Sequence, residues 1–163
     1  MIALLLTLAC KQDPGPDSAP VGLTPLEGEW TIRWAETLSG DCLLSDMDSR
    51  RTEDVWEIRL ESTGFTLYDE TGYPVGCLFV DEGFTCDLGS TSTDYAEPGG
   101  TTTERIHAAI NGHFVSERAL EGGYETAASC TGADCEDLGS NYGRDFAYPC
   151  TSIAAFEGEL TEP

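Results

Sequence analysis

Apolar and polar residues alternate along most of the chain after residue 28. In Glu29–Trp34 and in Val55–Glu61, tryptophan, isoleucine or leucine occupies every second position, and polar residues lie between. This period of two predicts half-buried strands, because successive side chains of a strand point to opposite faces of the sheet. Similar runs predict further strands at 65–68, 74–80, 84–88, 104–110, 113–120, 124–129 and within 147–160.

Turn-forming residues separate these runs. Asp81–Gly83 predicts a turn, and Asn111–Gly112 predicts a tight hairpin because both of its turn positions favour positive φ. Gly122–Gly123 is expected to turn the chain again, and segments 89–103 and 131–144 are expected to be loops. The predicted fold class is all-β, an antiparallel meander of about eight strands that closes into a barrel. A two-sheet β-sandwich is the alternative, since both folds need inward apolar alternation.

The first 25 residues differ in character from the rest. Met1–Ala9 is uncharged and too short to span a bilayer, which needs about 20 apolar residues. Its length suits the apolar part of an export signal. Lys11–Pro25 contains four prolines among glycine, aspartate and serine, a composition typical of a flexible tether. We therefore expect a signal peptide over 1–9, Cys10 and a tether over 10–25, and an all-β domain over 26–163.

The stretch Leu6–Cys10, with the sequence Leu-Thr-Leu-Ala-Cys, resembles the lipobox of bacterial lipoproteins. The resemblance implies that Cys10 is lipidated and becomes the mature N-terminus, so that the membrane is a partner through the lipid anchor. A multiply acylated cysteine anchors stably, whereas a single chain is marginal. The expected location is the bacterial cell envelope, at the outer membrane. The alternative is a buried N-terminal strand or helix with an unrelated cysteine.

Export would place the other six cysteines in an oxidising compartment, where an even number predicts disulfides. These are Cys42, Cys77, Cys86, Cys130, Cys135 and Cys150. Three bonds among them have 15 connectivities. Alternation places Cys77 and Cys86 on neighbouring strands, which favours that pair. We also expect Cys130–Cys135 and Cys42–Cys150, without a geometric argument for either. A zinc site is the disfavoured alternative.

The length, the net charge and the motifs of the chain limit the classes of function that it can have. A chain of 163 residues suggests one domain, and a net charge of −22 argues against nucleic acid as a partner, because phosphate binding needs a positive surface. No Gly-x-Ser-x-Gly motif and no phosphate-binding loop occurs in the sequence. His107 and His113 are the candidate bases for a hydrolytic site, and we expect both to be surface or half-buried residues. We therefore predict no catalytic residue and no enzyme activity.

Calcium is the one cofactor that the sequence suggests, because hard divalent ions bind carboxylates on loops. Asp46 and Asp48 in one acidic loop, and Asp134 and Asp137 in another, are the weak candidate ligands. Arg50 and Arg51 stand where an EF-hand would need a ligand and a glycine, so that motif is excluded. No other cofactor is expected.

Gly28-Glu29-Trp30 resembles the Gly-x-Trp motif on the first strand of lipocalins. The resemblance implies a barrel whose interior holds a small apolar ligand. The candidate lining residues are aromatic, namely Trp30, Trp34, Trp56, Phe79 and Phe114. The alternative is an interior filled by its own side chains.

These observations together predict a lipid-anchored, non-catalytic envelope protein that binds a small apolar ligand or an envelope protein. A structural or adhesive surface module without a pocket is the alternative, and a hydrolase-type enzyme is the third candidate. An enzyme would show His107 or His113 in a cleft beside a carboxylate.

Overall fold

Eight antiparallel strands form a closed barrel in the computed structural model, which describes residues 23–42, 52–97, 100–136, 138 and 147–162. Each strand pairs with its neighbours in sequence, and β1 pairs with β8 to close the barrel. The strands are β1 (Gly28–Gly40), β2 (Glu53–Leu60), β3 (Gly64–Tyr68), β4 (Pro74–Val80), β5 (Gly83–Glu97), β6 (Gly100–Ser116), β7 (Ala119–Thr131) and β8 (Cys150–Glu162). The predicted all-β meander is confirmed, and the sandwich alternative is wrong.

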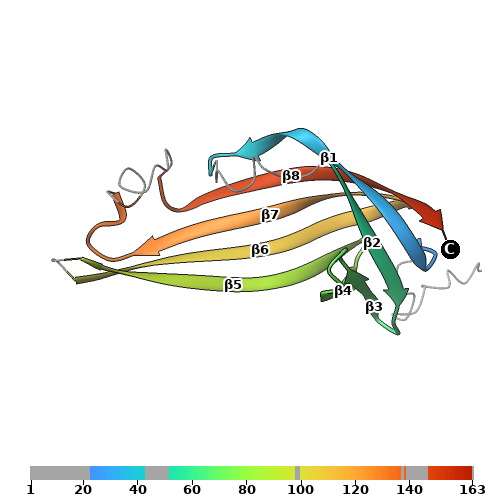
Figure 1. The fold of residues 1–163 in the computed structure, drawn as a ribbon, viewed down its shortest axis with the longest axis horizontal. Helices are drawn as coiled ribbons and strands as arrows, with labels where there is room; N and C mark the ends of the chain where they lie inside the picture. Colours follow the sequence, from blue (N-terminus) through green and yellow to red (C-terminus); the bar gives the residue numbers. More distant parts are fainter. Residues whose placement is uncertain (1–22, 43–51, 98–99, 137, 139–146, 163) are drawn as a thin grey trace, which may run out of the picture.

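The strands differ greatly in length, and this divides the barrel into two halves (Figure 1). Strands β2, β3 and β4 have 8, 5 and 7 residues, whereas β5 and β6 have 15 and 17. All eight strands surround the interior in what we call the short-strand half. Strands β5 to β8 continue far beyond β2–β4 into the long-strand half (Figure 1). We call the free end of the short-strand half, where β1 begins and β8 ends, the entry end.

Aromatic side chains fill the short-strand half. The alternation predicted for β1 and β2 is confirmed, because Trp30, Ile32, Trp56 and Ile58 are all buried. They belong to one core cluster with apolar residues from the other strands, among them Phe114. The residue pattern therefore positions the core as elementary strand geometry requires.

Two predicted turns are wrong, because Asn111–Gly112 and Gly122–Gly123 lie within strands. Asn111 pairs with Thr85 on one side and Gly123 on the other. The glycines serve packing there: a Cβ on Gly112 would lie 2.6 Å from Cζ of Phe84. A glycine in a strand interior often marks such a close approach. The β6–β7 turn comes later, between Ser116 and Ala119.

The predicted loop at 89–103 is also wrong. Its serines and threonines form the ends of β5 and β6, paired in register from Ser90 with His107 to Ala96 with Thr101. Hydrogen bonds between the two strands pair the backbone N–H and C=O groups of this segment, and threonine side chains fit the pleated surface of a strand well. Of the predicted loop at 131–144, the structure describes 131–136 and 138, which hold the end of β7 and a short helical turn.

The described chain contains three disulfides, and all three predicted pairs are confirmed. Cys77–Cys86 joins directly opposite residues of β4 and β5. Cys130–Cys135 closes a small loop at the end of β7. Cys42–Cys150 ties the residues after β1 to the start of β8 in the long-strand half, across 108 positions of sequence.

Candidate functional site

The five aromatic residues predicted to line a ligand cavity pack against one another and their neighbours. Trp30 lies 6.1 Å from Phe114 between ring centroids, and Trp34 lies 6.0 Å from Trp56. Phe79 lies 6.4 Å from Phe114 and is 37% exposed at the entry end. Edge-to-face contacts of this kind add to the free energy of apolar burial. The structure thus brings the predicted residues into contact with one another. Four of them belong to the core or pack against it, whereas Phe79 lies at its exposed edge.

The inner face of the long-strand half is polar, a feature that the sequence patterns did not reveal. The buried polar residues of the described chain all lie there, namely Thr102, Glu104, Thr126 and Ser152. The carboxylate of Glu104 is 2% exposed and accepts hydrogen bonds from the hydroxyls of Tyr95 and Tyr148. No buried side-chain nitrogen or oxygen in the described ranges lacks a partner, as buried polar groups require.

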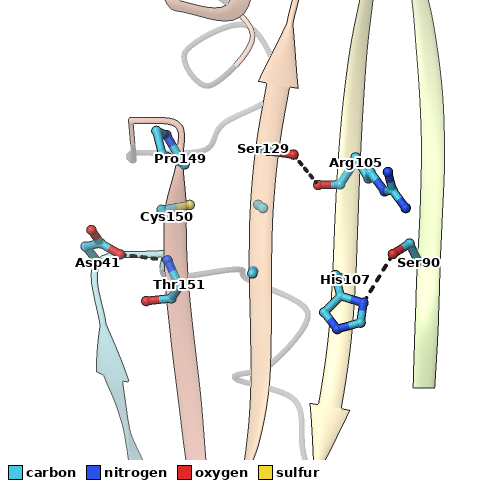
Figure 2. A pocket seen from close by; sticks show the side chains of 10 residues that line it. Asp41, Ser90, Arg105, His107, Ser129, Pro149, Cys150 and Thr151 are labelled. Atoms are coloured by element: carbon cyan, nitrogen blue, oxygen red, sulfur yellow. Dashed lines mark hydrogen bonds between the residues drawn. The ribbon is translucent and has the colours of Figure 1, made fainter. Parts of the chain in front are cut away.

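An open groove of about 470 Å³ lies on the outer face of the long-strand half (Figure 2). Strands β5 to β8 and Asp41 form it, with Ala127 of β7 as part of its floor. Successive residues of these strands face opposite sides of the sheet. Arg105 and Thr151 line the groove, and their chain neighbours Glu104 and Ser152 are buried on the inner face. The groove is thus separated from the interior by the sheet itself.

Two rows of paired residues cross this groove. One row runs from Ser90 through His107 and Ala127 to Thr151. On the next row, Arg105 lies between Ser92 and Ser129. The Asp41 carboxylate accepts a hydrogen bond of 2.7 Å from the Thr151 amide, which fixes the wall opposite Arg105 (Figure 2). The long strands bring together residues that lie over 100 positions apart in sequence.

Arg105, like Arg118, forms no ion pair with a carboxylate of the residues that the structure describes, whereas two other arginines do. Arg33 lies 3.2 Å from Glu159 and 3.7 Å from Glu53, and Arg59 lies 2.8 Å from Glu57. The cross-strand neighbours of Arg105 are neutral serines, and no ion pair involves its guanidinium among the described residues. A guanidinium with free donors is well suited to a carboxylate or phosphate group.

His107 lies in this groove beside two polar groups. The Ser90 hydroxyl is 3.2 Å from Nδ1 of His107, and the Asp87 carboxylate is 3.9 Å from the same nitrogen. A nucleophile and an orienting carboxylate in a catalytic triad approach opposite nitrogens of the imidazole. His113 lies on the outer face of β6, 3.9 Å from Glu121. Both histidines are therefore exposed strand residues, as expected, and His107 has the cleft and the carboxylate but not the triad geometry.

Carboxylates line a second outer groove, of about 640 Å³, in the short-strand half. They are Glu27, Glu29, Glu57, Asp69 and Glu70, with Arg59 among them. The hydrogen bond from Arg59 to Glu57, followed by the charge of Glu57, raises the pKa of Arg59 above its ordinary value. Hydrogen bonds from Thr71 and then from the Tyr73 amide lower the pKa of Asp69. This groove is acidic, whereas the groove in Figure 2 contains Arg105, for which the described residues supply no ion pair.

The structure describes only one of the four predicted calcium ligands, so the calcium site stays a prediction. Asp46, Asp48 and Asp137 lie outside the described residues, and Asp134 follows β7 in a half-buried turn. Among the residues that the structure describes, no group of three or more histidine, cysteine, aspartate or glutamate side chains could hold a metal ion.

The N-terminal predictions fall mostly outside the structure. Signal residues 1–9, Cys10 and most of the tether precede the described chain, and Pro25 is buried against the barrel. A search of the described ranges finds no helix with the length and apolar character to cross a membrane. Comparisons with protein-family models, with curated proteins and with solved structures find no match.

Proposed function

We propose that this chain is a lipid-anchored, non-catalytic binding protein of the bacterial cell envelope. The barrel is a rigid scaffold, and its outer groove binds an envelope partner through a carboxylate or phosphate group. The observation that carries this proposal is Arg105, which lines an open groove and has no ion pair with any carboxylate in the described part of the chain.

The packing of the interior supports binding on the outer face. Trp30, Trp56 and Phe114 are buried against other rings, so they present little free surface to an apolar ligand. The groove also favours binding over nucleophilic catalysis, because Ser90 and Asp87 compete for one nitrogen of His107. Anchoring rests on the lipobox resemblance of Leu6–Cys10.

The anchor is tested by cell fractionation of the full chain in a bacterial host. We expect the parent protein in the membrane fraction with a lipid mass on Cys10, and the Cys10→Ser variant in the soluble fraction. Membrane retention of the unacylated variant would contradict the anchor.

The groove is tested by placing a photoreactive amino acid at Ala127 on its floor. Ala119 is the matched control, because it is also a half-buried alanine of β7 but lies at the entry end. We expect an envelope protein to be cross-linked from Ala127 and not from Ala119. Equal labelling from both positions would count against the groove.

Arg105→Gln is expected to remove this cross-link. Arg118→Gln is the control, because it makes the same charge change at an exposed arginine outside the groove. If both variants lose the cross-link equally, net charge and not the groove explains the binding. A small molecule that co-purifies with the domain in native mass spectrometry would instead favour an apolar ligand in the interior.

A further inference from the structure

Exposed large apolar side chains gather at the entry end of the barrel. Among the described residues, ten large hydrophobic side chains are exposed, and six belong to segments that meet there. We call these six the entry-end patch: Leu23, Leu26, Leu78, Phe79, Val80 and Val115. Scattered exposed apolar residues are ordinary, but a gathering at one end of a molecule marks an interaction surface.

Contacts between the strands hold the patch together. The Leu26 amide donates a hydrogen bond of 2.9 Å to the Glu117 carbonyl, so the segment before β1 reaches the β6–β7 turn beside Val115. The Phe79 amide donates to the Thr63 carbonyl at 3.2 Å, which joins the end of β4 to the β2–β3 turn. The Phe114 ring lies beneath, in contact with both Trp30 and Phe79. Of the patch residues, Phe79 thus touches the aromatic core directly, and Leu78, Val80 and Val115 lie on the outer face around it.

The chain reaches the barrel at this same end. Leu23 is a member of the patch, and Cys10, the predicted lipidation site, lies only 13 residues before it. Even a fully extended segment of that length spans about 45 Å. The tether therefore keeps the entry end near the bilayer and gives the patch a high effective concentration there, so that weak apolar contacts suffice for docking.

We infer that the entry-end patch docks on the surface of the bilayer that holds the lipid anchor. This inference rests on the anchor in the proposed function. The patch is bordered by Asp81, Glu82 and Glu117, and the chain has a net charge of −22. Anionic lipid would repel these carboxylates, so the fitting surface is a zwitterionic one. Docking at the entry end would point the long-strand half, with the groove of Figure 2, away from the membrane.

The test compares two tryptophan variants of the acylated full chain in phosphatidylcholine vesicles with brominated acyl chains. Val80→Trp places the probe in the patch, and Ile153→Trp places it on the outer face of β8 in the long-strand half. The two positions are 44% and 39% exposed, so they are closely matched. The native Trp30, Trp34 and Trp56 line the barrel interior and provide the background emission.

We expect bromine to quench most of the emission added by Val80→Trp and little of that added by Ile153→Trp. Adding Val115→Asp to the Val80→Trp protein should abolish this quenching, because a charge in the patch opposes burial in lipid. Replacing part of the phosphatidylcholine with anionic phosphatidylglycerol should weaken the quenching of Val80→Trp, because the carboxylates beside the patch are repelled. Equal quenching at the two positions, or quenching that Val115→Asp leaves unchanged, would overturn the inference.

Two further outcomes separate the inference from the proposed function. If the chain does not float with the vesicles, the anchor itself is wrong and both fail. If it floats but Val80→Trp is not quenched, the anchor stands and only the docking is wrong. Sedimentation of the soluble Cys10→Ser protein tests self-association: a dimer that Val115→Asp dissociates would assign the patch to a second copy and overturn lipid docking.

Discussion

In the short-strand half, Trp30, Phe65 and Phe114 pack ring against ring, whereas the inner face of the long-strand half buries Thr102, Glu104 and Ser152. The first half is surrounded by all eight strands, and the second is built from the extensions of the long strands (Figure 1). The fully buried members of the apolar cluster in the long-strand half are small side chains and a disulfide, namely Cys42, Ala128, Cys150 and Ala154. Larger side chains pack against this cluster but are only partly buried, namely Trp34, Ile106, Tyr124 and Tyr148.

The two halves of the barrel therefore have different roles: the short-strand half contributes most of the stability, and the long-strand half carries the groove proposed for binding. Burial of large apolar side chains is the dominant favourable contribution to folding, so the short-strand half should be the more stable half. A region with few such contacts depends on hydrogen bonds and covalent links, and it opens at a lower free energy. The outer groove lies on the long-strand half, where a partner can be accommodated without disturbing the aromatic core.

The largest expected effect is the loss of the long-range disulfide in the long-strand half. Replacing Cys42 and Cys150 by serine should lower the free energy of unfolding by about 5 kcal/mol, because the entropy of closing so long a loop no longer limits the unfolded chain. Replacing Cys77 and Cys86, which are nine positions apart, should cost about 3 kcal/mol by the same reasoning. Urea unfolding without reductant measures both. A smaller loss for the Cys42–Cys150 variant would show that the long-strand half opens separately from the rest.

The second largest loss of stability is expected when an aromatic ring of the core is removed. Phe114→Ala removes a ring in contact with Trp30, Phe65, Phe79 and Phe84 and should cost about 3–5 kcal/mol. The control is the adjacent Val115→Ala, which is 51% exposed and should change the stability by about 0.5 kcal/mol or less. Both are read from urea midpoints. Equal effects would mean that Phe114 is not part of a continuous core.

The buried carboxylate of the long-strand half should have an intermediate effect. Glu104→Gln leaves one acceptor oxygen where two oxygens now accept hydrogen bonds from two tyrosine hydroxyls, and it should cost about 1–3 kcal/mol. Glu121→Gln, on the outer face of β7, is the matched control and should have little effect. If the two variants unfold at the same urea concentration, the polar inner face does not stabilise this half.

The smallest effect is expected at Asp69, in the β3–β4 turn. Its pKa is lowered because the Thr71 hydroxyl, then the Tyr73 amide, donate hydrogen bonds to the carboxylate. A lowered pKa in the folded state gives stability that is present above the unfolded value of about 4 and is lost as the pH falls through the folded value. Since this carboxylate faces solvent, Asp69→Ala should cost less than about 1 kcal/mol at pH 7.

Thermal unfolding of the parent and the Asp69→Ala protein between neutral and acidic pH measures this contribution. The difference between their melting temperatures should be largest at neutral pH and should disappear in strong acid. A difference that stays constant with pH would mean that the ionised carboxylate does not stabilise the turn.

Alternation was sufficient to predict most of the short-strand half. Trp30, Ile32 and Ile58 are buried as their spacing required, and Cys77 lies opposite Cys86. The predicted turns at Gly112 and Gly122 were wrong because glycine has two uses in a barrel. It permits positive φ in turns, and it also leaves room for a ring in the middle of a strand. The identity of the residue does not distinguish these uses.

The candidate site was predictable only in part. The sequence singled out His107 as a candidate base, but no local sequence pattern pointed to Arg105, Ser90 or Thr151 as site residues. They are separated by up to 61 positions, since Thr151 follows Ser90 by that distance, and only the ladders of β5 to β8 place them side by side. Asp46, Asp48 and Asp137 lie outside the described residues, so their expected role as calcium ligands stays a prediction.

The sequence by itself determined the all-β class, the strand alternation and the pairing of neighbouring cysteines, because each depends on residues close together in the chain. The tertiary structure alone decided where the polar inner face, the outer groove and the entry-end patch lie. These features combine residues from strands that are distant in sequence, and their register is set by closure of the barrel. The unequal strand lengths then decided which half is filled by rings and which carries the groove.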